Sequence, residues 1–144
     1  MTRRLALATV LLLVACSGLP SPPDLVVVAE DGEVRVAPLS YCWNDVDRGL
    51  DACATGTYPL SNPTNVGGVD GRIEFLWHVD GWRFEAGIND PGDQANQIGL
   101  DATYEGAGLW VLDPGARVGL QEVYISGRGP EGDVGFIFLA ELSE

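Results

Sequence analysis

Residues 73–88 read IEFLWHVDGWRFEAGI, and this stretch decides the fold class. Apolar and polar residues alternate on both sides of Asp80-Gly81, which is the period of a half-buried β-strand. Asp and Gly tolerate the positive φ that a two-residue hairpin turn requires. A register that pairs Val79 with Trp82 buries the aromatic residues on one face and leaves His78 opposite Arg83 on the other, and a one-residue slip inverts both faces. The stretch therefore predicts an antiparallel hairpin.

Short strand signals continue on both sides of this stretch, and no window shows helical periodicity. Residues 25–29 and 33–36 flank Asp31-Gly32 and predict another hairpin. Further strands are expected at 109–112, 120–126 and 134–142, with polar or Gly-rich loops at 89–103 and 127–133. Seven or eight short strands with this spacing predict an all-β fold, specifically an antiparallel immunoglobulin-like β-sandwich over residues 24–144.

The N-terminal segment predicts export. Arg3 and Arg4 precede an apolar run from Leu5 to Ala15, which is too short to span a bilayer. Its end, Leu13-Val14-Ala15-Cys16, resembles the bacterial lipobox. The resemblance implies that residues 1–15 are a signal peptide, that cleavage precedes Cys16, and that lipid on Cys16 anchors the protein to a membrane outside the cytoplasm. An ordinary secretory signal followed by a chance Cys is the alternative. Residues 16–23 contain three prolines and are expected to form an extended tether.

The charge of the chain excludes one class of partner. The net charge is −13, with 21 acidic against 8 basic residues, all of the latter Arg. Nucleic acids and anionic lipid headgroups are bound through Lys and Arg contacts, so we expect no nucleic-acid partner.

Two cysteines remain if Cys16 carries lipid. Cys42 and Cys53 are an even pair in an oxidising compartment, which favours a disulfide. The alternative is a zinc site, but zinc needs three or four protein ligands and the chain adds only His78 to the two thiols.

A second resemblance concerns the folded part of the chain. Tyr41-Cys42-Trp43, the second cysteine Cys53 and the Gly-rich segment 126–133 before Phe136 resemble secreted lipoproteins of GC-rich bacteria. Those proteins have immunoglobulin-like domains without an assigned activity. The resemblance implies the same fold here, although Cys42 and Cys53 are too close in sequence for the inter-sheet bridge of an antibody domain.

Side chains for catalysis are scarce. The single histidine, His78, lies in a predicted strand with no nucleophile motif beside it, so we expect no enzyme. Asp45, Asp47 and Asp51 lie in the Cys42–Cys53 loop and loosely resemble a calcium loop, but the final Glu is missing and Arg48 would repel a cation. A solvated acidic loop is the alternative.

Two tryptophans are the remaining candidates for ligand contact. Trp43 and Trp110 lie outside the paired aromatic stretch, and exposed Trp serves as a platform in sugar- and peptide-binding modules, although core packing is its commoner role. The sequence thus predicts a lipid-anchored, non-catalytic interaction or structural module of the cell envelope, whose partner is an envelope protein or a polysaccharide. The alternatives are a calcium-dependent binding domain and a small wall-polymer hydrolase.

Overall fold

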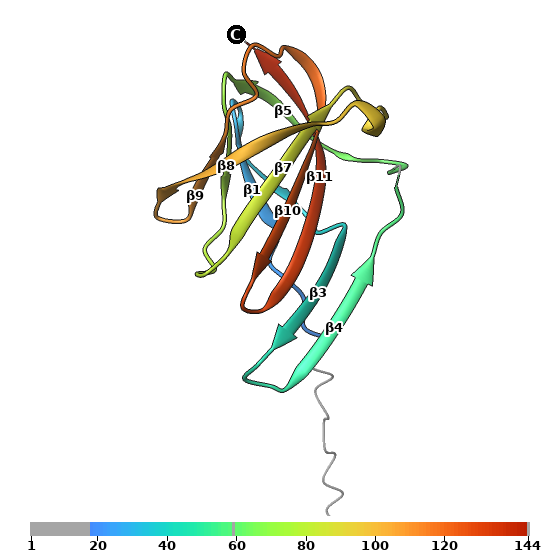
Figure 1. The fold of residues 1–144 in the computed structure, drawn as a ribbon, viewed down its shortest axis with the longest axis vertical. Helices are drawn as coiled ribbons and strands as arrows, with labels where there is room; N and C mark the ends of the chain where they lie inside the picture. The colour runs from blue at the N-terminus through green and yellow to red at the C-terminus, as the bar shows by residue number, and fades with distance from the viewer. Residues whose placement is uncertain (1–17, 59, 144) are drawn as a thin grey trace, which may run out of the picture.

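A computed structural model of the protein describes residues 18–58 and 60–143 and shows one all-β unit (Figure 1). The strands are β1 (Leu25–Ala29), β2 (Gly32–Val36), β3 (Ser40–Asp45), β4 (Leu50–Thr55), β5 (Thr64–Asp70), β6 (Ile73–Leu76), β7 (Arg83–Asn89), β8 (Ile98–Gly106), β9 (Leu109–Leu112), β10 (Gly119–Gly129) and β11 (Gly132–Ser143). The only helical element in the described chain is a single 3₁₀ turn at Gln94–Asn96. The prediction of an all-β fold is confirmed, with more strands than the sequence analysis expected.

The strands form a single curled sheet. Hydrogen-bonded neighbours follow the order β2-β1-β6-β9-β8-β7-β10-β11-β3-β4, and all of these pairs are antiparallel, whereas β5 pairs with β11 in parallel. Strand β8 joins two halves of the sheet, β2-β1-β6-β9 and β7-β10-β11-β3-β4, because its first residues pair with β7 and its last residues pair with β9. The curl brings β5 back towards β1, where the amide of Glu30 donates to the carbonyl of Gly68 at 2.9 Å.

The core fills the inside of this curl. Its largest fully buried side chains come from strands of both halves of the sheet and are Phe75, Phe136, Phe138, Leu25, Ile73, Ile88, Leu112 and Ile125. Because consecutive side chains of a strand point to opposite faces, each long strand supplies one apolar row to the core. The β3–β4 hairpin extends beyond the rest of the molecule at the end opposite the C-terminus (Figure 1).

The hairpin predicted over residues 73–88 is wrong in its strand pairing, but the prediction of which residues are buried and which are exposed is confirmed. Strand β6 pairs with β1 and β9, whereas β7 pairs with β8 and β10, so the two strands lie in different halves of the sheet. Residues 77–82 cross between the halves, with Gly81 at φ 79°. Phe75, Trp77, Trp82 and Phe84 are nevertheless buried and His78 is exposed. Two strands that face one core from opposite sides bury the same residues as two paired strands of a hairpin. The alternation of apolar and polar residues therefore could not show which strands pair.

The predicted loop at 127–133 is also wrong. Strands β10 and β11 run almost to each other and leave only the two residues Pro130 and Glu131 between them. The glycines that suggested a loop serve packing instead. A Cβ atom at Gly129 would overlap the indole of Trp82, and one at Gly127 would overlap the ring of Phe84. Glycine occurs here because aromatic rings lie against the strand.

Other segments agree more closely with expectation. The β1–β2 hairpin is confirmed, with Leu25 opposite Val36 and Ala29 opposite Gly32. The polar loop expected at 89–103 is shorter, since β8 already begins at Ile98.

The N-terminal predictions fall mostly outside the described residues. The signal peptide, the lipobox and Cys16 all lie in 1–17. From residue 18 on, the predicted tether is described, and there Pro20 and Pro22 are buried, so this part packs on the domain. A search of the described chain for a helix that is long and apolar enough to cross a membrane finds none.

Candidate functional site

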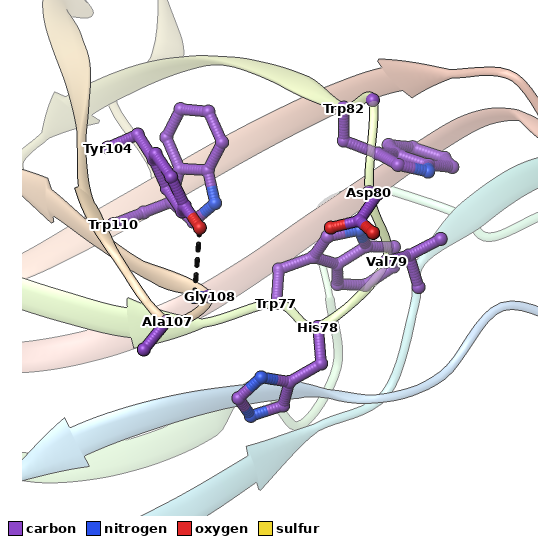
Figure 2. A pocket seen from close by; sticks show the side chains of 10 residues that line it. Trp77, His78, Val79, Asp80, Trp82, Tyr104, Ala107, Gly108 and Trp110 are labelled. Atoms are coloured by element: carbon purple, nitrogen blue, oxygen red, sulfur yellow. Dashed lines mark hydrogen bonds between the residues drawn. The ribbon is translucent and has the colours of Figure 1, made fainter.

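An aromatic cleft opens where the chain crosses between the two halves of the sheet. It has a volume of about 490 Å³. One side is formed by the crossing segment 77–82 and the other by β8, the β8–β9 turn and β9 (Figure 2). The aromatic and ionisable side chains of the lining are Trp77, His78, Asp80, Trp82, Tyr104 and Trp110.

Tyr104 and Trp110 form one wall of the cleft. They are cross-strand neighbours in β8 and β9, and their ring centroids are 5.1 Å apart. Trp110 is half-buried and is fixed from behind by Phe84, at a centroid distance of 5.0 Å, and by Phe75, at 6.3 Å. The side chain of Tyr104 is held at its hydroxyl, which accepts a hydrogen bond from the amide of Gly108 at 3.3 Å, yet the residue stays 54% exposed. The wall is therefore an ordered aromatic surface that is open to solvent.

Trp77 and Trp82 form the facing wall. Their ring centroids are 5.1 Å apart and both residues are almost fully buried. Trp82 Nε1 donates to Glu131 Oε2 at 2.8 Å, and the ring stacks on Trp43 at 5.4 Å. Trp77 Nε1 is buried and has no hydrogen-bond partner among the described residues. A buried indole N–H normally has a partner, so this donor is unusual.

The rim of the cleft contains a strained turn. The backbone of Trp77 donates to the carbonyl of Gly108 at 2.8 Å, which ties the crossing segment to the β8–β9 turn. Gly108 has φ 81°, and a Cβ atom there would overlap the ring of His78. Ala107 has φ 51° and is the one non-glycine residue with a positive φ in the described chain. Such a conformation costs about 1 kcal/mol or more and is typical of ligand sites and tight turns.

The electrostatics of the cleft are simple. Asp80 is exposed at the rim and supplies the single formal charge of the lining when His78 is neutral. None of the arginines in the described residues belongs to the lining. The ion pairs of the described residues lie elsewhere and involve Arg48 and Arg72. The site thus offers aromatic faces, one carboxylate and one unpartnered donor.

The disulfide predicted between Cys42 and Cys53 is confirmed. The two cysteines face each other across β3 and β4, and both are exposed. Trp43 lies on the opposite, inward face of β3, where it packs against Trp77 and Trp82. The bridge therefore closes the hairpin that supports the buried wall of the cleft.

The three carboxylates of the predicted calcium loop do not converge. Asp51 is the cross-strand neighbour of Asn44, so it points to the face opposite Asp45. Asp45 accepts a hydrogen bond from the amide of Arg48 at 3.1 Å and pairs with its guanidinium at 3.6 Å. Asp47 is exposed in the turn between them. No group of three metal-ligating side chains occurs in the part of the chain that the structure describes.

A second polar cluster lies at the far end of β7 from the cleft. Glu122 is only 7% exposed, and its Oε1 accepts hydrogen bonds from Tyr58 at 2.9 Å and from Asn89 Nδ2 at 3.2 Å. Burial, followed by the hydrogen bond and the negative charge of Glu122, raises the pKa of Tyr58. These interactions anchor Tyr58 to β10. They do not place a nucleophile beside a general base.

Sequence reasoning found part of the cleft. Trp110, predicted as a possible platform, lines it, whereas Trp43 lies behind Trp82. Tyr104 was missed because no motif marks it, and Asp80 was assigned only to a hairpin turn. Comparison of the chain with family models, with curated proteins and with solved structures found no match. The chain's own residues and geometry therefore have to carry any functional inference.

Proposed function

We propose that this protein is a lipid-anchored, non-catalytic binding module of the cell envelope that holds its ligand in the aromatic cleft. Lipid on Cys16 keeps the protein at a membrane surface outside the cytoplasm, after removal of residues 1–15. The domain that follows binds an envelope component, either a polysaccharide or a protein. We also propose that the strands form an immunoglobulin-like β-sandwich. The two halves of the sheet would be its two layers, and β8 would belong to both.

The observation that supports binding is the exposed face of Tyr104 beside Trp110. Large aromatic side chains usually enter the core, and burying one stabilises a protein by about 1.5–3 kcal/mol. Here Tyr104 stays 54% exposed, and together with the half-buried Trp110 it forms an ordered wall of the cavity. Concave sites with aromatic walls and a few polar groups are the usual form of ligand sites. The absence of a nucleophile–base–acid arrangement from this lining favours binding over catalysis.

The anchoring part is tested by fractionation of a bacterial host that expresses the full chain. We expect the wild-type protein in the membrane fraction and Cys16→Ser in the soluble extracytoplasmic fraction, because one thiol carries the lipid. Detection of Cys16→Ser in the membrane fraction at the wild-type level would contradict lipid anchoring.

The binding part is tested by retention on insoluble envelope material from the same host. We expect Tyr104→Ala to lower the retained fraction at least tenfold, since the open wall of the cleft is lost. Ile98→Ala is the matched control, because Ile98 lies in the same strand β8 and is 47% exposed outside the cleft. Equal retention of Tyr104→Ala and the wild-type protein would remove the cleft from the proposed function.

A further inference from the structure

We infer that the aromatic cleft binds a neutral sugar ring of a polysaccharide, stacked on Tyr104 and hydrogen-bonded from the opposite side by the crossing segment 77–82. This inference rests on the proposed function and names the chemical class of its ligand.

Tyr104 and Trp110 offer flat apolar surface from two hydrogen-bonded strands, and the packing of Trp110 on Phe84 prevents it from turning away. A pyranose ring with equatorial hydroxyls has a flat face of C–H groups that fits such a surface. Because the rings are ordered before binding, little side-chain entropy is lost when the ligand stacks.

The wall opposite Tyr104 carries the carboxylate of Asp80, which accepts, and the side chain of Trp77, whose buried N–H has no partner among the described residues. In Figure 2, Asp80 and Trp77 lie on the side of the opening that faces Tyr104 and Trp110. A sugar hydroxyl both donates and accepts, so one ring satisfies both kinds of group. A purely apolar ligand would leave them without partners.

An anionic sugar would meet Asp80, no lining arginine and a protein of net charge −13. A cation would be attracted by Asp80 and by the net charge, but it would meet the aromatic faces of only one wall, because Trp77 and Trp82 are 3% and 5% exposed. Cation–π sites hold the cation over exposed ring faces, which Trp77 and Trp82 do not offer. A neutral ring is the ligand that this combination fits.

The test is a titration of the full chain, purified in a detergent whose headgroup contains no sugar, and followed by tryptophan fluorescence and calorimetry. The probes are cellohexaose and chitohexaose as neutral sugars, an oligogalacturonate as an anionic sugar, and choline as a cation. We expect at least one neutral hexamer to bind and the two charged probes not to bind at the same concentration. Tyr104→Ala is expected to weaken binding at least tenfold, and Asp80→Asn several-fold, whereas Ile98→Ala leaves it unchanged.

Folding of each variant is checked by its near-ultraviolet circular dichroism before titration. Failure of both neutral hexamers at millimolar concentration would overturn the inference, as would tighter binding of a charged probe or unchanged binding by both Tyr104→Ala and Asp80→Asn. If the hexamers fail while Tyr104→Ala still loses retention on envelope material, the sugar class is wrong and the proposed binding function stands. If retention is also unaffected, the proposed function fails as well.

Discussion

Replacing Phe75 by alanine is expected to lower the free energy of unfolding by about 3–5 kcal/mol, which is the usual cost of removing a buried phenylalanine ring. Phe75 is fully buried in β6 and lies between the two halves of the curled sheet. Its ring contacts Phe84 of β7, at a centroid distance of 5.2 Å, and stacks on Trp110 of β9 at 6.3 Å. The substitution leaves a cavity that rigid strands on both sides cannot close.

Urea unfolding followed by tryptophan fluorescence and circular dichroism measures this change. Tyr104→Ala is the control, because it removes an aromatic ring of similar size that also contacts Trp110 but is largely exposed. We expect that control to cost less than about 1 kcal/mol, in keeping with substitutions at exposed positions. A loss below about 1 kcal/mol for Phe75→Ala would show that the aromatic core is not the main support of the fold. We also expect Phe75→Ala to displace Trp110, which stacks on the Phe75 ring, and so to weaken the cleft.

Removal of the disulfide has the second largest expected effect. Cys42 and Cys53 are separated by 11 positions, and on the chain-entropy model a bridge over such a loop stabilises the folded state by about 3 kcal/mol. The β3–β4 hairpin depends on this bridge more than an internal strand would. Among the described strands β4 pairs only with β3, and β3 pairs with β11 over the four positions from Ser40 to Trp43.

The double variant Cys42→Ala with Cys53→Ala is therefore expected to unfold at a lower urea concentration than the wild-type protein. Hydrogen exchange should rise first in β3 and β4, because their exposed backbone bonds open before the core does. Adding a thiol reductant to the wild-type protein should reproduce the loss, since both cysteines are exposed, and should leave the double variant unchanged. Equal stability of the oxidised wild-type protein and the double variant would mean that β3–β4 is held by its strand pairing and by Trp43 alone.

The failures of sequence reasoning share a cause in long-range packing. Gly127 and Gly129 carry the composition of a loop, yet they lie within β10 because the rings of Phe84 and Trp82 occupy the space of their missing side chains. Asp80-Gly81 carries the composition of a hairpin turn, yet the strands it joins belong to different halves of the sheet. Local composition reports conformational freedom and says nothing of which distant side chain fills the space.

The sequence by itself determined the all-β class, the buried and exposed faces of residues 73–88 and the Cys42–Cys53 pair. Alternation with period 2 and the count of cysteines are local properties, and burial of apolar surface acts on them directly. The sequence also predicts export and lipid on Cys16, and both predictions concern residues outside the described part of the chain. Only the tertiary structure decided strand order, the separation of Asp45 from Asp51, and the meeting of Tyr104 with Asp80 across one cleft. The physical reason is that backbone hydrogen bonding is the same for every strand, so the choice of partner depends on how all side chains pack at once.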